Sequence, residues 1–292
     1  MPIYKRFSPL TLKEMQNRTR SPRSFGLLTV FLCLVGGVAL LMYAAAMINE
    51  TRRNASTIGQ TLYFIIIGMQ LVLVCFVAPA LTATAISNER ERGSYDVLCA
   101  SLITPWQIVR GKLGAALGYT FLLIISTLPL LSLPLMLGGI EPFETVISIW
   151  IMLVSGLMFT SIGLFVSTFC KTNLGAIILT YSFVLLMVIG IPIFALIASS
   201  FGAVLFTGSS TLERFFMTLM IILTSLSPIS TLVATELNFY SNGKLWEFSV
   251  PITGTTPLNL LPPFVILTIC YVLLTLFTLW LAARRVSQAD KS

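Results

Sequence analysis

The sequence predicts an all-α polytopic membrane protein with six transmembrane helices. Hydrophobic residues make up 56% of the 292-residue chain and its mean hydropathy is +0.93, whereas a soluble domain is about 45–50% apolar. Apolar runs of about 20 residues or more recur along the chain, which is the length that a ~30 Å hydrocarbon layer requires. Charged residues are only 10% of the chain and lie mainly between these runs. We therefore expect a single transmembrane domain, 1–292.

The first 24 residues have the pattern of a short basic helix in the membrane interface. In "FSPLTLKEMQNRTRSPRSF", Ser8 suits a helix N-cap and Pro9 suits the first helical position. A basic helix with apolar residues between its charges can lie among lipid headgroups, and a disordered basic leader is the alternative. The charged residues of this segment are Lys13, Glu14, Arg18, Arg20 and Arg23.

The six spans are expected at 25–48, 62–92, 105–138, 143–169, 174–198 and 262–283. A further apolar run, Phe215–Thr231, is short and is interrupted at Ser227-Pro228, which favours a re-entrant or interfacial helix over a seventh span. It belongs to the long connection 199–261. We expect that connection to have structure of its own, with a helix over 212–226 as its main element.

The basic residues set the orientation of these spans. With six spans and both termini in the cytoplasm, all but four of the 18 Lys and Arg residues fall on the cytoplasmic side. The connection 199–261 is then external. A seventh span would move the C-terminal basic residues outside, so the distribution favours six. The four external basic residues are Arg52, Arg53, Arg214 and Lys244.

The spans contain almost no ionisable side chains. Apart from the cytoplasmic ends of spans two and three, the only charge is Glu144, near the outer end of span four. Intramembrane charges mark proton relays and ion sites, so their scarcity argues against ion-coupled transport and against intramembrane catalysis. The chain has no histidine, and we expect neither a catalytic nor a metal site. Three mildly polar residues could line a pathway or bond helix to helix: Gln70, Thr82 and Thr84.

The most charged part of the chain joins spans two and three. In "ISNERERGSYDVLCASLITPWQIVRGK", Gly93 suits a helix end that needs positive φ, and Ser94 is an N-cap for a second short helix, "YDVLCAS". Such a segment either anchors two spans or docks on a soluble partner, and its local pattern fits both uses. Its charged residues are Glu89, Arg90, Glu91, Arg92, Asp96, Arg110 and Lys112.

The stretch "TATAISNERERGSYDVLCASLITPWQIVRGKLGAAL" resembles the segment after the second span in permeases of the ABC type-2 transporter family. Ser94 replaces the usual threonine and keeps the capping hydroxyl, while Asp96 and Cys99 depart from the commoner residues. The basic N-terminal stretch also resembles the connecting helix of that family. The matching positions are Thr82, Ala85, Ile86, Glu89, Arg90, Glu91, Gly93, Leu98, Pro105, Gly111 and Lys112.

The resemblance implies the membrane subunit of an ATP-driven exporter. Its short cytoplasmic helix, within 87–104, would be a coupling helix that contacts a separate ATPase subunit. Two permease subunits, identical or related, would form the substrate pathway. The residues implied in coupling are Glu89, Arg90, Glu91, Arg92, Gly93, Ser94, Tyr95, Asp96 and Leu98.

The expected cofactors and partners are those of such an exporter subunit. The only "GK", Gly111-Lys112, lacks the other residues of a phosphate loop, so ATP and Mg²⁺ are expected on the partner ATPase and no cofactor on this chain. The net charge of +7 is assigned to cytoplasmic flanks in the bilayer and not to nucleic acid. The expected location is the inner (cytoplasmic) membrane of a prokaryote. A secondary transporter or channel without an ATPase, or a polytopic scaffold or assembly factor, is the alternative.

Overall fold

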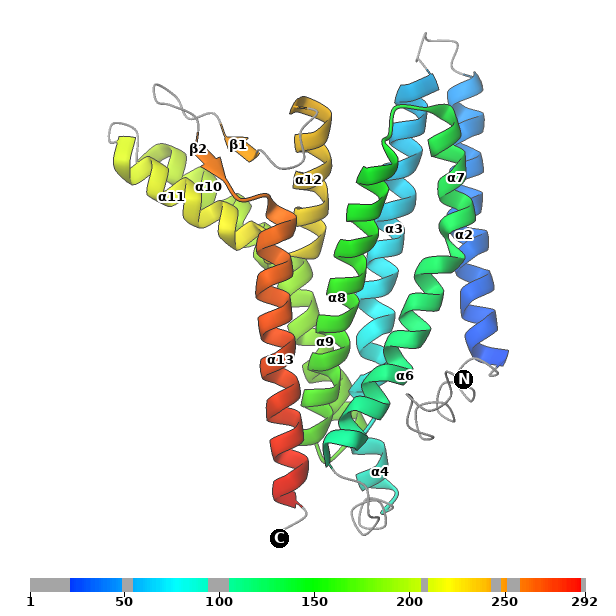
Figure 1. Cartoon of the computed structure of the whole chain (residues 1–292), viewed down its shortest axis with the longest axis vertical. Coiled ribbons are helices and arrows are strands. Elements are labelled where there is room, and N and C mark those ends of the chain that lie inside the picture. Colours follow the sequence, from blue (N-terminus) through cyan, green and yellow to red (C-terminus); the bar gives the residue numbers. More distant parts are fainter. Residues whose placement is uncertain are drawn as a thin grey trace, which may run out of the picture. The chain divides into compact units, whose positions relative to one another are not determined.

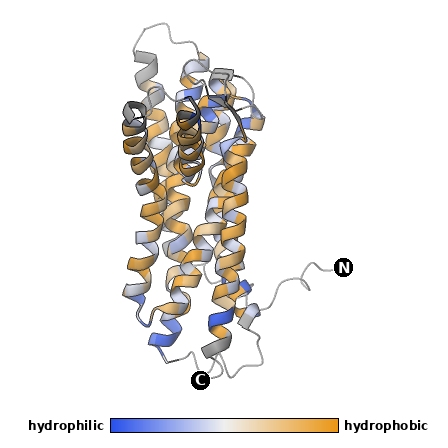
Figure 2. Cartoon of the chain, turned by 90° about the vertical axis from the view of Figure 1, so that its left-hand side faces the viewer, coloured by the Kyte–Doolittle hydropathy of each residue, from blue (hydrophilic) through white to orange (hydrophobic). Residues whose placement is uncertain are grey.

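The computed structural model describes residues 22–48, 55–93, 105–205, 210–242, 248–250 and 258–289. This part is almost entirely helical, and its helices are mostly hydrophobic along their middles and hydrophilic at their ends (Figure 2). The protein is a multi-pass membrane protein, as predicted from composition. The helical stretches long and apolar enough to cross a membrane are Ala55–Glu91, Trp106–Leu137, Pro142–Phe169, Asn173–Phe201 and Pro263–Val286.

The chain divides into two compact units, and the first comprises residues 1–181 and 275–292. In this unit α8 is the central helix, with α3 packed along it and α6 beside it (Figure 1). The helices of this unit are α2 (Pro22–Ile48), α3 (Ala55–Ala83), α4 (Ser87–Glu91), α6 (Pro105–Ser126), α7 (Leu128–Leu137), α8 (Pro142–Phe169), the start of α9 (Asn173–Leu185) and the end of α13 (Pro263–Ala289).

The close packing of α3 on α8 depends on small residues. A Cβ atom on Gly163 would lie 2.4 Å from the Thr82 hydroxyl and 3.0 Å from the Pro79 carbonyl oxygen. The Thr82 hydroxyl donates a hydrogen bond to the Thr160 carbonyl at 2.9 Å, one turn earlier on α8. The missing side chain at Gly163 therefore lets the two helices approach until a side chain on one bonds the backbone of the other.

The third predicted span, 105–138, is broken at Thr127 into α6 and α7. Pro129 lies at the second position of α7 and has no N–H to continue the α-helical ladder. The Ile124 carbonyl at the break accepts hydrogen bonds from the Thr127 hydroxyl at 2.8 Å and from the Gln70 side-chain amide of α3 at 3.2 Å. The break is therefore stabilised by a neighbouring helix.

The second unit comprises residues 182–274. After α9 a π-helical turn, Leu186–Gly190, leads into α10 (Ile191–Leu205), which packs against α11 (Ser210–Thr224). Helix α12 (Pro228–Asn242) follows α11 at a bend of 115° between their axes. Two three-residue strands, β1 (Phe248–Val250) and β2 (Leu258–Leu260), pair antiparallel, with Phe248 opposite Leu260.

The bend between α11 and α12 is bonded to two other helices of the second unit. Pro192 has no N–H to donate to the carbonyl four residues earlier, that of Val188, and this carbonyl accepts a hydrogen bond from the Ser227 hydroxyl at 3.2 Å. The Tyr271 hydroxyl of α13 donates to the Leu226 carbonyl at 2.7 Å. Backbone groups that are left over where helices end or change type therefore find partners across the unit.

Several predicted boundaries need correction. The helix of the second span begins at Ala55 and not at 62, and the helix of the fifth continues to Leu205 and not to 198. The interruption at Ser227-Pro228 is confirmed, but the predicted helix 212–226 is only the first of two, and the strand pair departs from an all-helical fold. The first predicted span lies in α2, whose apolar stretch, Leu28–Leu41, is shorter than the five long ones.

Candidate functional site

The charged segment after α3 begins with a break in the helix. Helix α3 ends at Ala83, and a turn over 84–86 leads into α4. The Ser167 hydroxyl of α8 accepts hydrogen bonds from the backbone N–H groups of Ile86, at 2.8 Å, and Ser87, at 3.0 Å. These are donors that a helix start leaves without an intrahelical partner. One buried serine on the central helix thus fixes where the charged segment departs from the span.

Lys112 of α6 forms an ion pair with Glu89 of α4. Its Nζ lies 2.7 Å from a Glu89 carboxylate oxygen and also donates to the Ala85 carbonyl at 2.9 Å. The Lys112 side chain is only 7% exposed and that of Glu89 is 25% exposed. A charge buried to this degree needs both a counter-ion and further hydrogen bonds to offset its lost hydration, and Lys112 has both. The pair therefore joins α4 to the first turns of α6, the start of the third predicted span.

Arg90 and Glu91 bond to the turn between α8 and α9. The Arg90 guanidinium donates to the Thr168 carbonyl at 2.8 Å, among the last carbonyls of α8, where a positive charge also complements the helix dipole. Asn173, the first residue of α9, donates its amide to the Glu91 carboxylate and to the Asn88 side-chain oxygen, the latter at 3.3 Å. Asn173 also accepts from the Ser87 hydroxyl at 2.8 Å.

An apolar cluster supports this polar network. It contains residues from the α3–α4 turn, α6, α8 and the last part of α13, all of which belong to the first unit. Because apolar burial holds the four segments together, a displacement of α4 is expected to move the ends of α6, α8 and α13 with it. The buried members are Ile86, Val109, Leu113, Leu164, Leu279 and Val286.

The predicted coupling residues occupy different positions in this arrangement. Glu89 and Arg90 are half-buried and bonded within the chain, whereas Glu91, Arg92 and Gly93 are exposed. Gly93 has φ +66°, the left-handed conformation predicted for it from its place after a helix. The remaining residues of the predicted contact lie outside the described residues, and their coupling role stays a prediction: Ser94, Tyr95, Asp96 and Leu98.

The predicted connecting helix also lies outside the part that the structure describes. Of its charged residues only Arg23 falls in a described helix, at the second position of α2, and its side chain is not described. An interfacial position for this segment stays a prediction. The other four residues are Lys13, Glu14, Arg18 and Arg20.

Two of the three candidates for a pathway lining are buried between helices. Gln70 bonds the α6–α7 break, and Thr82 bonds α8, so both make the interhelical hydrogen bonds that were the alternative use. Thr84 lies in the α3–α4 turn and is half-buried. A role for any of the three in lining a pathway stays a prediction.

Three members of the network form contacts that no local feature of the sequence indicates. Ser167 and Asn173 lie more than 70 residues after α4, and only the packing of α8 beside α3 brings them to it. Lys112 was recognised as a family position but without its partner. The position of a lysine just before an uncharged span is the one clue that its charge would be paired.

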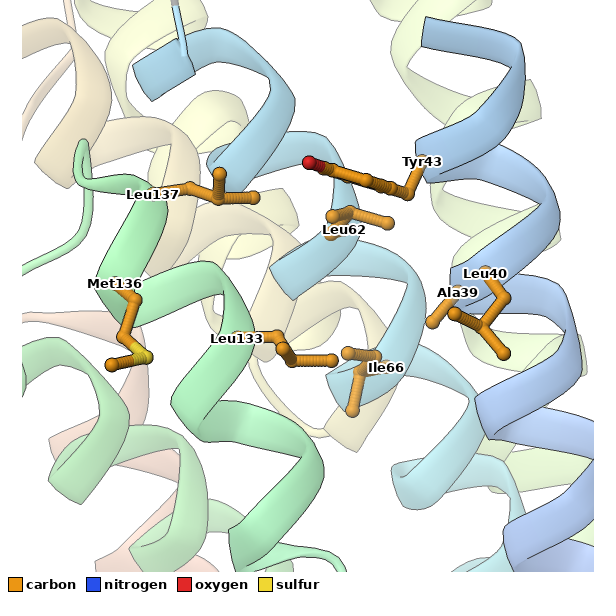
Figure 3. Close-up of a pocket in the computed structure, with 8 residues that line it drawn as sticks. All are labelled: Ala39, Leu40, Tyr43, Leu62, Ile66, Leu133, Met136 and Leu137. Carbon is orange, nitrogen blue, oxygen red and sulfur yellow. The ribbon is translucent and has the colours of Figure 1, made fainter. Parts of the chain in front are cut away.

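An apolar cavity of about 320 Å³ lies at the opposite end of the first unit from α4, between α2, α3 and α7 (Figure 3). The Tyr43 hydroxyl is the only polar side-chain group among the lining residues. Within the described residues no group of three or more Cys, Asp or Glu side chains could hold a metal ion. The lining residues are Ala39, Leu40, Tyr43, Leu62, Ile66, Leu133, Met136 and Leu137.

The chain matches a known protein family. The sequence model of the family described as "ABC-2 family transporter protein" matches residues 9–285, which is almost the whole chain. No curated protein matches the chain.

Proposed function

We propose, from the premise that this chain belongs to the ABC-2 family of transporter proteins, that it is the membrane subunit of an ATP-driven exporter. The observation that carries the proposal is the family match over residues 9–285, which includes the charged segment and all six predicted spans. ATP hydrolysis belongs to separate ATPase subunits, which bind ATP and Mg²⁺. The chain itself supplies the membrane pathway and no catalytic residue.

The proposed topology has six spans with both termini in the cytoplasm. Helix α2 is the first span, since its 27 residues extend about 40 Å at 1.5 Å per residue. The α11–α12 pair, bent by 115°, enters from the external side and returns to it. This assignment keeps Arg284 and Arg285 on the same side as Arg90 and Arg92, in agreement with the positive-inside rule.

The ATPase is proposed to bind the exposed part of the segment 87–104. Arg92 and Gly93 are exposed at the end of α4, whereas Glu89 and Arg90 bond to α6 and α8. A force applied to the exposed part is therefore passed through α4 to α6 and α8. In this arrangement the outer residues of the charged segment contact the ATPase, and the inner residues connect that contact to the spans. Closure of the two ATPases on nucleotide binding would move the spans by this route.

A second permease subunit completes the proposed pathway. The described part of α2 exposes large apolar side chains, including Leu40 and Leu41, so this helix has a face that lipid or a second subunit must cover. We propose a dimer of two copies, or of this chain with a related one, in the cytoplasmic membrane of a prokaryote.

Co-purification from native membranes tests this function. The tagged chain, extracted in mild detergent, is expected to retain an ATPase with phosphate-loop motifs in a one-to-one ratio. Arg92→Glu is expected to remove the ATPase, because it reverses an exposed charge at the proposed contact. Lys244→Glu makes the same charge change on the predicted external side and is expected to leave the complex intact. A chain that never retains an ATPase would overturn the proposal.

A further inference from the structure

Helix α13 carries an exposed apolar stripe that ends in an arginine. Leu276, Trp280 and Arg284 follow one another at intervals of four residues, so they lie on one face of the helix. Leu276 is 61% exposed and Trp280 is 53% exposed. The opposite face is buried in the first unit and carries Thr275, Leu279, Ala282 and Val286.

The last turns of α13 hold two arginines over aromatic rings. The guanidinium carbon of Arg284 lies 5.3 Å from the centre of the Trp280 ring, and that of Arg285 lies 4.3 Å from the centre of the Phe169 ring of α8. A stacked guanidinium is attracted by the ring face and keeps the N–H groups at its edge available. Both arginines are exposed.

A third cation lies near this pair. Lys171 is exposed and follows Phe169 by two residues, so its backbone is within about 7 Å of the residue on which Arg285 stacks. Arg284, Arg285 and Lys171 form no ion pair within the described part of the chain. The Glu91 carboxylate accepts a hydrogen bond from Asn173, two residues after Lys171.

We infer that Arg284, Arg285 and Lys171 bind the phosphate headgroup of an anionic phospholipid whose acyl chains lie along Leu276, Phe277 and Trp280. The apolar stripe faces hydrocarbon, and tryptophan is a residue typical of the boundary between hydrocarbon and headgroups. Cations one turn beyond Trp280 therefore stand at the level of the lipid phosphates. A soluble protein would bind a surface that is exposed to water. This patch instead continues directly into the apolar face of a spanning helix, which faces lipid.

The preference for an anionic lipid follows from the charge of the patch. Each Lys or Arg near an anionic membrane surface contributes about fivefold to binding, and three cations that form no ion pair with a described residue gather here. Because the attraction is electrostatic and exposed to water, it is expected to weaken as the salt concentration rises. The lipid site requires that α13 spans the membrane, but it does not require an ATPase. Failure of the lipid test and failure of the ATPase test are therefore independent results.

Quenching of Trp280 by brominated lipids tests this site. A variant with Trp106, Trp150 and Trp246 replaced by phenylalanine keeps Trp280 as the only tryptophan. In bilayers of phosphatidylcholine and phosphatidylglycerol, with bromine on one lipid at a time, the two quenching curves give the relative binding constant at Trp280. We expect phosphatidylglycerol to be preferred by about fivefold or more at low salt.

Variants separate this site from a general attraction to positive charge. Arg284→Gln with Arg285→Gln is expected to bring the ratio close to one, and Lys171→Gln alone is expected to lower it. Arg110→Gln is the matched control, because it removes the same positive charge from an arginine on another helix, α6. In the unsubstituted chain Arg110 also stacks on an aromatic ring, that of Trp106, with 4.8 Å to the ring centre. Arg110→Gln is expected to leave the ratio at Trp280 unchanged.

Three results would overturn the inference. The first is a ratio near one in the variant that keeps all the cations. The second is a ratio that survives both the double substitution and Lys171→Gln. The third is an equal loss on Arg110→Gln, which would show a preference set by net charge alone.

Discussion

At the scale of single residues, the most consequential contact is the ion pair between Lys112 and Glu89. The lysine is almost fully buried, and removing Glu89 would take away the counter-ion of that buried charge. Breaking a fully buried pair costs about 3–5 kcal/mol, and the partial exposure of Glu89 lowers that figure. The same pair is a direct bond between α4 and α6.

Substitution of one partner tests this assignment. Glu89→Gln is expected to lower the free energy of unfolding by about 2–3 kcal/mol, because it leaves the Lys112 charge without its counter-ion. The change is measured by thermal unfolding in detergent, monitored through the labelling of the buried Cys75 thiol as it becomes accessible. Arg92→Gln removes an exposed charge on the same helix and is expected to change stability by less than about 0.5 kcal/mol. Equal stability of the two variants would contradict the assignment.

Gly163 provides a second test at this scale. Gly163→Ala is expected to destabilise the protein by about 1–3 kcal/mol, because the new methyl group meets the Thr82 hydroxyl and the Pro79 carbonyl. Gly37→Ala is the matched control in α2, where a Cβ atom meets nothing within 4 Å. It is expected to be neutral or to stabilise by about 0.5–1 kcal/mol through helix propensity. Gly163→Ala with the stability of Gly37→Ala would mean that α3 and α8 are farther apart than described.

At the scale of elements, the breaks in the helices fall where the chain changes direction or meets a neighbour. The turn after α3 is bonded to Ser167, the α6–α7 break to Gln70, and the α11–α12 bend to Tyr271, which donates to the Leu226 carbonyl. In each case a polar side chain from another helix satisfies a backbone group that the break released. The hydrocarbon core of a bilayer has no hydrogen-bonding groups, so these bonds hold the broken helices in one conformation there.

The bend between α11 and α12 is expected to loosen when its hydrogen bonds are removed. Ser227→Ala and Tyr271→Phe each delete one bond, worth about 0.5–1.5 kcal/mol. Amide hydrogen exchange over residues 224–231 is expected to rise by roughly two- to tenfold in each variant. Ser200→Ala is the control, since the Ser200 hydroxyl bonds a carbonyl of its own helix, that of Leu196. Exchange equal to that of the control would show that these bonds do not hold the bend.

Sequence reasoning located the helices better than the contacts between them. The break at Ser227-Pro228 and the positive φ of Gly93 were predicted because proline and glycine act through their own backbone. The roles of Lys112, Ser167 and Asn173 were not predicted, because they depend on residues 23 to 86 positions apart that only the fold brings together. The extra turns at Ala55 and Leu205 were missed because Ala, Ser and Thr continue a helix after the strongly apolar run has ended.

At the scale of the whole molecule, the inner and outer residues of one charged segment have different roles. Its inner residues, Glu89 and Arg90, bond to α6 and α8, and its outer residues are exposed for a partner. The same end of the first unit carries the arginines of α13, so a lipid site and a protein contact are proposed on neighbouring surfaces. The segment 94–104 completes the proposed contact and lies outside the described residues.

Site-specific photo-crosslinking from position 92 tests the central claim most directly. A photoreactive amino acid in place of Arg92, irradiated in native membranes, is expected to form an adduct with an ATP-hydrolysing subunit. The same group in place of Met136, which is 85% exposed at the opposite end of the first unit, is expected to form none. Failure to form an ATPase adduct from position 92, or equal adducts from both positions, would contradict the account.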